Sequence, residues 1–260
     1  SREAGVGNSA LMEHAGLAVA EYVRNHLGEV RGVSIIVLIG PGNNGGDGLV
    51  TALHLRKWGG IVTTYVCQAN RDKDPKIAIL EKMGVRMLFA SRDKEFAGLR
   101  CTLMSTQIVI DAILGTGRSR SITGVLRNVL IELSFARERR SGLQVVALDV
   151  PTGLDANTGL VDPLCPVVDV TVALGYPKVG LYELPGAKHA GHVRVVDIGV
   201  PPGLADDINI DLMTPEFANA TLPDRPLYAH KGTFGRALVV AGSSSYVGAA
   251  YLAASAAFRS

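Results

Sequence analysis

Three short segments combine glycine with carboxylate, amide and hydroxyl side chains: residues 40–48 (GPGNNGGDG), 111–117 (DAILGTG) and 149–155 (DVPTGLD). Each lies at the end of an apolar stretch of the kind that forms a buried strand. In open α/β sheets, ligands bind beyond the carboxyl ends of the strands. An acid before a helix is usually a cap, so one such segment would be a weak signal. Three of them predict a shared binding site.

Residues 40–48 have the composition of an anion-binding loop, yet they match no complete nucleotide-binding motif. Glycine permits a sharp turn, and the N-terminus of a following helix offers unpaired N–H groups. Gly40, Gly42 and Gly45 satisfy G-x-G-x-x-G in form. The dinucleotide fingerprint also needs an acid about 20 residues further on, but residues 66–68 (VCQ) end the next strand without one. Asp47 places a carboxylate where a pyrophosphate would bind, and no Lys-Ser/Thr pair of a Walker loop follows.

The polar side chains of the three segments suit a hard cation. Asn44, Asp111 and Thr152 offer only oxygen ligands, which favour an alkali ion, Mg²⁺ or Ca²⁺ over zinc. The histidines show no metal-binding spacing. The three cysteines, which we expect to be unreactive core thiols, are Cys67, Cys101 and Cys165.

Two charged residues near these segments have simpler predictions. Asp155 is expected to be a turn residue. Lys178, in residues 175–182 (GYPKVGLY), follows another apolar stretch. It could bind a phosphate or be solvated, and the sequence favours neither alternative. Without a G-x-S-x-G elbow or a credible Ser-His-Asp order, acyl transfer is not expected.

The elements that must position these residues alternate along the chain. Apolar, β-branched runs predict strands, and helical spacing of apolar residues predicts helices between them. This alternation indicates right-handed βαβ units, a mostly parallel, doubly wound sheet and a three-layer αβα sandwich. The predicted strands are 33–39, 61–67, 85–89, 108–112, 144–148, 168–174 and 192–198, and the predicted helices are 47–58, 75–83 and 124–139.

Composition excludes several classes of protein. The 260 residues include 26 Lys and Arg and 24 Asp and Glu, a net charge of +2, and 47% are hydrophobic. This balance is not that of a disordered chain and gives no broad electrostatic footprint for nucleic acid. Three cysteines cannot form a disulfide framework, which favours a reducing compartment and, we expect, the cytoplasm.

The C-terminal part predicts a second structural unit. Residues 222–226 (LPDRP) read as a linker, and residues 236–258 as a new strand followed by a helix. Residues 237–258 carry no charge, but Gly242 and three serines interrupt them, so we expect no membrane span. No signal peptide is expected in the first 30 residues. The chain lacks an initial Met and stops after an apolar stretch, so we expect a fragment of a longer protein.

The three segments, in this order, resemble the YjeF N-terminal domain, the NAD(P)H-hydrate epimerase family. Residues 11–16 (LMEHAG), 175–182 (GYPKVGLY) and 195–201 (VVDIGVP) are similar to further motifs of that family. The resemblance covers roughly residues 1–215 and implies a Rossmann-like fold. Residues 229–260 resemble the start of an ADP-dependent NAD(P)H-hydrate dehydratase domain, which is ribokinase-like.

The resemblance implies a domain organisation and a chemistry. It predicts an epimerase domain at 1–221, a linker at 222–229 and a truncated dehydratase start at 230–260. The expected substrate is NADH or NADPH hydrated at C6, whose R and S forms are interconverted. The substrate-binding positions implied by the family are Asn43, Asn44, Gly45, Gly46, Asp47, Gly115, Thr116, Gly117, Arg118, Ser119, Arg120, Ser121 and Asp149.

The resemblance also implies catalytic, cofactor and partner assignments. Asp149 is the expected acid–base catalyst, and Asn44, Asp111 and Thr152 the expected K⁺ ligands. ADP and Mg²⁺ would serve the dehydratase of a longer chain, while this chain should lack that activity. A homodimer or higher homo-oligomer is expected, with neither nucleic acid nor membrane as partner.

Two other functions remain as alternatives. A non-catalytic scaffold or binding module of the same fold should have lost the acid, whereas this chain has Asp149, Asp111 and Asn44. An NAD-dependent dehydrogenase is the other alternative, and the missing ribose-binding acid speaks against it.

Overall fold

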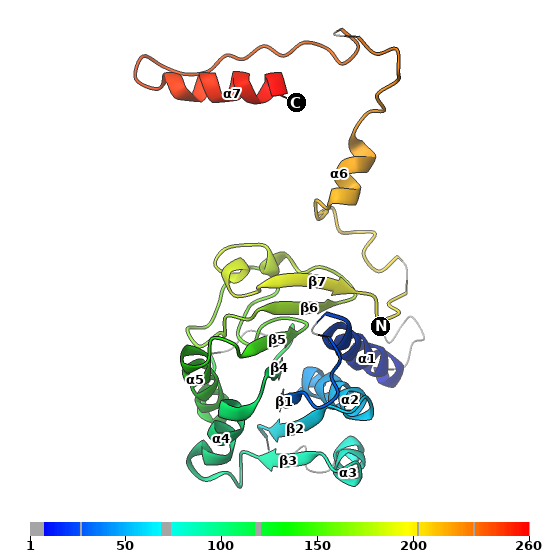
Figure 1. The fold of residues 1–260 in the computed structure, drawn as a ribbon, viewed down its shortest axis with the longest axis vertical. Coiled ribbons are helices and arrows are strands. Elements are labelled where there is room, and N and C mark those ends of the chain that lie inside the picture. The colour runs from blue at the N-terminus through cyan, green and yellow to red at the C-terminus, as the bar shows by residue number, and fades with distance from the viewer. Residues whose placement is uncertain are drawn as a thin grey trace. The chain divides into compact units, whose positions relative to one another are not determined.

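The computed structural model describes residues 8–26, 28–68, 74–117, 121–201, 203–230 and 232–259. The chain divides into two units, residues 1–209 and residues 210–260. The first unit contains the sheet and all three of the glycine-rich segments (Figure 1). The domain boundary expected near residue 221 stays a prediction.

The first unit is built on one seven-stranded sheet in which every neighbouring pair of strands is parallel. The strand order is β3-β2-β1-β4-β5-β6-β7, so the chain runs outward from β1 to β3 and then returns to the other side of β1. The strands are β1 (Ser34–Ile39), β2 (Ile61–Val66), β3 (Arg86–Phe89), β4 (Ile108–Ala112), β5 (Gln144–Leu148), β6 (Val170–Leu174) and β7 (His192–Val196). This arrangement confirms the predicted α/β class.

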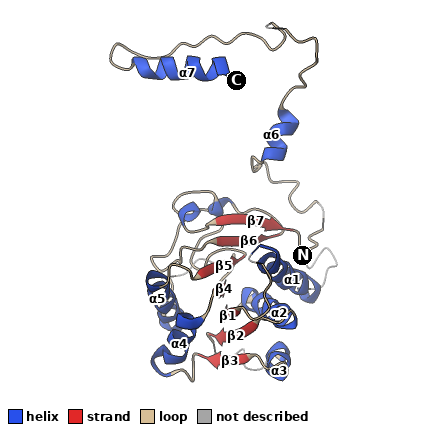
Figure 2. Ribbon diagram, viewed as in Figure 1, coloured by secondary structure: helices blue, strands red, loops and turns tan. Residues whose placement is uncertain are grey.

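Helices cover both faces of the sheet and complete the predicted three layers. In Figure 2, α1, α2 and α3 lie on one face and α4 and α5 on the other. The helices of the first unit are α1 (Asn8–His26), α2 (Asn43–Lys57), α3 (Pro75–Lys82), α4 (Ala97–Ser105) and α5 (Gly124–Arg139). Among the described residues, short 3₁₀ turns also occur at Lys94–Phe96, Val179–Leu181 and Gly186–Lys188.

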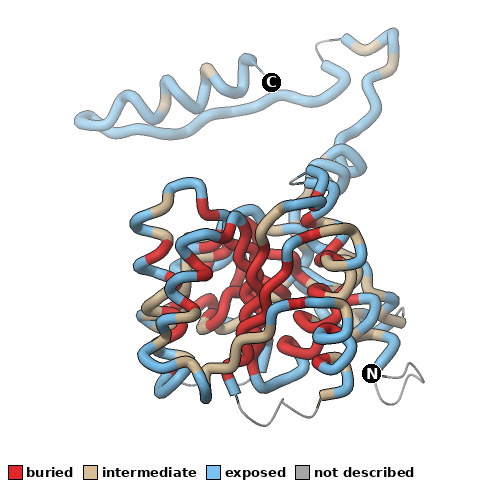
Figure 3. Tube along the Cα trace, turned by 60° about the horizontal axis from the view of Figure 1, so that its bottom comes forward, coloured by how far each residue is buried: buried red, intermediate tan, exposed pale blue. Residues whose placement is uncertain are grey.

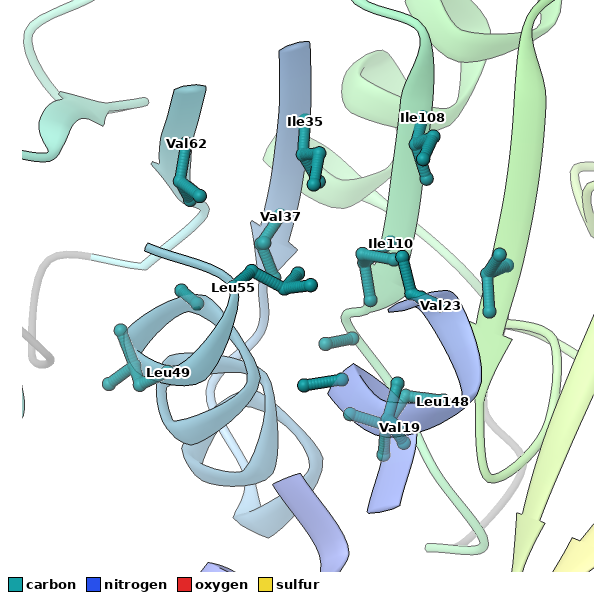
Figure 4. Packing of buried hydrophobic residues seen from close by; sticks show 14 of the residues in the cluster. Val19, Val23, Ile35, Val37, Leu49, Leu55, Val62, Ile108, Ile110 and Leu148 are labelled. Carbon is teal, nitrogen blue, oxygen red and sulfur yellow. The ribbon is translucent and has the colours of Figure 1, made fainter. Parts of the chain in front are cut away.

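The core lies on both faces of the central strands, where Figure 3 shows most of the buried residues. In β1, Ile35 and Val37 face the α1–α2 layer, and Ile36 and Leu38 face the α4–α5 layer. Figure 4 shows the first layer, with Val19 of α1 among the strand residues. Strands buried on both faces read as continuous apolar runs, which is why these strands could be predicted.

Two helices of the first unit, α1 and α4, are not among the helices predicted from apolar spacing. α4 (Ala97–Ser105) has only nine residues and begins beside Gly98, so its helical signal is short. Its N-terminus is stabilised from outside the helix, because the Asp93 carboxylate accepts from the N–H groups of Gly98 and Leu99 at 2.8 and 2.9 Å. This capping depends on a preceding loop, which helical spacing does not reveal.

The second unit contains α6 (Pro215–Thr221) and α7 (Val247–Arg259). The helix expected at its C-terminal end is therefore present, but the strand expected before it is not formed over residues 236–242. A strand needs a hydrogen-bonded neighbour, and none pairs with this exposed segment within the described residues. Across the part of the chain that the structure describes, no helix combines the length and apolarity needed to cross a membrane.

Candidate functional site

The three glycine-rich segments line one pocket of about 440 Å³ at the carboxyl ends of β1, β4 and β5. β1 and β4 are the strands between which the strand order reverses. Such a switch point is where open α/β sheets bind their ligands. The residues that line the pocket are Pro41, Gly42, Asn43, Asn44, Asp47, Ile113, Leu114, Gly115, Thr116, Gly117, Asp149, Gly153 and Leu154.

The first segment forms a tight turn and then enters α2 at Asn43, four residues before the predicted start at Asp47. Gly40 lies against the next loop, since a Cβ there would be 1.7 Å from the Ile113 carbonyl oxygen. Gly45 faces the same turn, where a Cβ would be 2.1 Å from the Gly40 carbonyl oxygen. The helix can begin this early only because both positions lack side chains. Asn43, Asn44 and Asp47 therefore lie in the first turns of α2 rather than in a loop.

A pair of matched glycine variants tests this close packing. We expect Gly45→Ala to destabilise the fold by about 3 kcal/mol, because the new methyl group meets backbone that cannot move freely. Gly42→Ala is the control, because a Cβ at Gly42 has no heavy atom within 4 Å. Its expected cost is below about 1 kcal/mol, for an N-cap position. Denaturant unfolding of the two variants measures both values, and equal stabilities would contradict the packing described here.

Asn44 presents a side-chain amide to the pocket. The residue is only 7% exposed, and its Nδ2 has no hydrogen-bond partner within the described residues. The amide lies beside Gly115, where an added Cβ would be 3.2 Å from Asn44 Oδ1. A buried donor without a partner carries a free-energy cost. The amide is therefore placed to interact with a bound ligand.

Asp111 lies at the carboxyl end of β4 and is fully buried. Its carboxylate accepts from the N–H of Thr152 at 2.8 Å, from Thr152 Oγ1 at 2.6 Å and from the N–H of Ile113 at 3.3 Å. Burial raises the pKa of Asp111, while the hydrogen bonds from Thr152 act in the opposite direction. Within the described residues no lysine or arginine forms an ion pair with it.

Thr152 connects the second and third segments. Its Oγ1 donates to Asp111 and accepts from the N–H of Leu114 at 3.0 Å, and the residue is fully buried. The group of Asn44, Asp111 and Thr152 offers a carboxylate, an amide oxygen and a hydroxyl, all of them hard ligands. This donor set fits a bound cation of low charge. So does the buried carboxylate of Asp111, which pairs with no lysine or arginine within the described residues.

Asp149 follows β5 directly and adopts a left-handed backbone conformation, with φ of 72°. Its N–H donates to the Val172 carbonyl at 2.9 Å. Its Oδ1 accepts from the N–H of Leu174 at 3.1 Å and from Lys178 Nζ at 2.5 Å. The side chain is only 13% exposed and lines the pocket. A non-glycine residue at positive φ is uncommon and often occurs at functional sites.

Of the two alternatives left open by the sequence for Lys178, the structure contradicts the solvated side chain. Its side chain is 16% exposed and is bound to Asp149 Oδ1 and, at 2.7 Å, to the Leu174 carbonyl. It is therefore not solvated, and its ammonium group is directed at the carboxylate next to the pocket. The two residues are 29 positions apart in sequence, and only the parallel pairing of β5 with β6 brings them together.

The remaining expected residues divide into three groups. Gly45 and Gly46 are buried in α2 and do not line the pocket, and Ser121 is exposed and is not part of its lining. Arg118, Ser119 and Arg120 lie outside the described residues. The lining also includes residues that were not predicted, although all of them fall within the three quoted segments: Pro41, Gly42, Ile113, Leu114, Gly153 and Leu154.

Two minor expectations have different outcomes. Asp155 is a turn residue as predicted, since its Oδ1 accepts from the N–H groups of Asn157 and Thr158, which lowers its pKa. Cys67 and Cys165 are buried, and burial raises their pKa. Cys101 is exposed at the surface of α4, so its assignment to the core was wrong.

Comparisons with known proteins point to one family. A family model described as YjeF-related protein N-terminus matches residues 8–180. The chain is 35% identical over its full length to the bifunctional NAD(P)H-hydrate repair enzyme Nnr of Moorella thermoacetica, covering 49% of that protein. It is 37% identical to the Nnr enzyme of Thermofilum pendens, over 95% of this chain and 46% of the relative.

A solved structure agrees with this fold. The crystal structure of yeast ynu0, YNL200c, superposes with a TM-score of 0.66 at 24% identity, over 83% of this chain and 90% of that one. The chain spans about half the length of the curated relatives it matches. Because the family model covers most of the sheet and all three pocket segments, the chain belongs to the YjeF-related protein N-terminus family.

Proposed function

We propose that this domain interconverts the R and S forms of NADH and NADPH that are hydrated at C6 of the nicotinamide ring. The observation that carries the proposal is Asp149, a carboxylate fixed by two donors at the edge of a pocket at the strand-order switch point. The relatives named above are NAD(P)H-hydrate repair enzymes. That shared name supplies the substrate class.

The chemistry needs one bond at C6 to break and re-form. Breaking C6–N1 gives the electron pair of the bond to N1, which takes up a proton, while the hydroxyl loses its proton to a base and C6 becomes an aldehyde. Breaking C6–O instead needs a proton on the hydroxyl, which leaves as water and leaves an iminium at C6. Both routes reverse onto the opposite face without a change in oxidation state. A single carboxylate beside the C6 oxygen can accept or return the proton in either direction, and Asp149 is our candidate.

The rest of the pocket would bind the substrate. Asn43, Asn44 and Asp47 from α2 and Gly115 to Gly117 from the β4 loop form two of its walls. Their amides and side chains are suited to the polar groups of a dinucleotide, and the N-terminal end of α2 favours negative charge. The partly buried apolar residue Leu114 provides a surface for a ring.

The proposal includes a K⁺ ion held by Asn44, Asp111 and Thr152. Its support is the buried carboxylate of Asp111, the Thr152 hydroxyl hydrogen-bonded to it and a donor set of oxygens. When bound, the ion supplies positive charge that offsets Asp111 and the phosphates of the substrate. Asp111 and Thr152 in turn hold the β4 and β5 loops together, which keeps the walls of the pocket in place.

Properties of a longer protein form part of the proposal as well. Dehydration of the S form with ADP and Mg²⁺ would reside in the half of the curated relatives that this chain does not span. The homodimer or higher oligomer expected from the resemblance stays a prediction, as does the cytoplasmic location.

The test uses a single purified epimer. We expect the protein to convert R-hydrated NADH into the S form much faster than buffer alone does. Chromatographic separation of the two epimers measures the conversion. Failure to accelerate this conversion in potassium buffer would contradict the proposal. Reduction of NAD⁺ with any of a panel of alcohols would instead favour a dehydrogenase.

A further inference from the structure

Lys178 forms a largely buried ion pair with Asp149, which lines the pocket. Its Nζ lies 2.5 Å from Asp149 Oδ1 and 2.7 Å from the Leu174 carbonyl oxygen. Both side chains of the ion pair are largely buried, at 16% and 13% exposure. An exposed pair contributes little and fluctuates, whereas a short, enclosed pair with a second anchor keeps one geometry.

The donors around Asp149 converge on one of its two oxygens. Both Lys178 Nζ and the N–H of Leu174 bind Oδ1. Within the described residues, no hydrogen bond reaches Oδ2. The carboxylate is therefore held by one oxygen and has the other available on a residue that lines the pocket.

The backbone conformation of Asp149 is one that contacts from neighbouring residues must stabilise. At φ of 72° the residue occupies a conformation that costs free energy for a residue with a side chain. The N–H bonds of Asp149 and Leu174 tie the β5 and β6 ends to each other. Within the described residues, the ammonium group of Lys178 is the one charged group that binds the carboxylate itself.

We propose that Lys178 is a positioning residue for catalysis: it fixes Oδ1 of Asp149 so that Oδ2 faces the C6 hydroxyl of the substrate and carries its proton. This inference rests on the proposed epimerase function. Lys178 itself exchanges no proton with the substrate. Small displacements of a catalytic group lower rates steeply, by about 100-fold for 1 Å.

The test compares Lys178→Met with Lys178→Arg in the same epimerisation assay. We expect the methionine variant to lower kcat by about 100-fold while KM changes by less than about threefold, because the lysine does not bind substrate. Arginine retains the charge and the contact with Oδ1, so it should restore kcat to within about tenfold of the wild-type value. If the methionine variant does not fold, the comparison of Lys178→Gln with Lys178→Arg tests the same inference.

A matched control removes another lysine ion pair. Lys76 pairs with Asp74 at 3.8 Å at the start of α3, outside the pocket, so Lys76→Met should leave kcat and KM unchanged. A kcat retained within twofold in Lys178→Met would overturn the inference. So would a rise in KM with kcat unchanged, which would indicate phosphate binding by Lys178. Failure of the epimerase proposal itself shows separately, as an inactive wild-type protein.

Discussion

Replacing Asp149 by asparagine is expected to reduce kcat/KM for epimerisation by about 10²- to 10⁴-fold, the usual contribution of a positioned acid–base group. The amide can still accept at Oδ1 from Leu174 and Lys178, but it cannot take up the substrate proton. Asparagine also tolerates the left-handed conformation that Asp149 adopts. The fold should persist at a cost of about 3 kcal/mol, because the largely buried ammonium group of Lys178 loses its carboxylate partner.

The measurement pairs a rate with a stability. Conversion of R-hydrated NADH gives kcat/KM, and thermal unfolding followed by circular dichroism shows whether the fold persists. Asp155→Asn is the matched control, because Asp155 lies in the same segment but is a turn residue that does not line the pocket. It should retain activity. Unchanged turnover in Asp149→Asn would show that another group moves the proton.

The centre of the sheet could be predicted because its strands are buried on both faces. β1 reads SIIVLI, and all but its first residue are buried. Such runs are distinctive in sequence, and predicted strand ends differ from the observed ones by no more than two residues. The mostly parallel direction of the strands followed from the helices predicted between them.

The start of α2 could not be predicted, because its cause is not local. Glycine is a poor helix former, so residues 43–46 read as loop. Gly45 and Gly48 are instead fixed by contacts with Gly40 and Ala112, on different strands or loops. Such contacts depend on the assembled sheet, and they override local propensity.

The pairing of Lys178 with Asp149 is hidden from sequence for a similar reason. Each residue follows the carboxyl end of a predicted strand, which was the available signal. Their contact also requires β5 and β6 to be adjacent and Asp149 to adopt positive φ. The sequence predicts neither. The types of residue at the site were thus readable from the motifs, whereas their mutual geometry came from the fold.

Thermal stability is expected to depend on potassium through Asp111. Burial raises the pKa of this carboxyl in the folded state, so the folded protein binds a proton more readily than the unfolded chain does. Without a compensating cation, the stability that Asp111 contributes falls as the pH rises from its pKa in the unfolded chain through its pKa in the folded protein. Above the folded pKa the ionised group carries a net cost, which a bound cation offsets.

The expected size of the effect follows from binding linkage. Potassium at 100 times its dissociation constant adds about 2.7 kcal/mol to the stability of the folded state. For a domain of this size that corresponds to a rise in Tm of about 5–10 °C. The comparison is between potassium chloride and tetramethylammonium chloride at equal ionic strength, with epimerisation rates measured in the same two buffers and in sodium chloride.

Asp111→Asn distinguishes a site from a general salt effect. Asparagine keeps an acceptor for the N–H of Thr152 but removes the charge that would hold the ion. The Tm of this variant should therefore be the same in potassium and tetramethylammonium buffers, whatever its absolute value. Two results together would show that Asn44, Asp111 and Thr152 do not form a cation site. The wild-type protein would unfold at the same temperature in potassium and tetramethylammonium buffers, and it would turn over at the same rate in all three salts. A potassium effect that persists in Asp111→Asn would place the ion elsewhere in the domain.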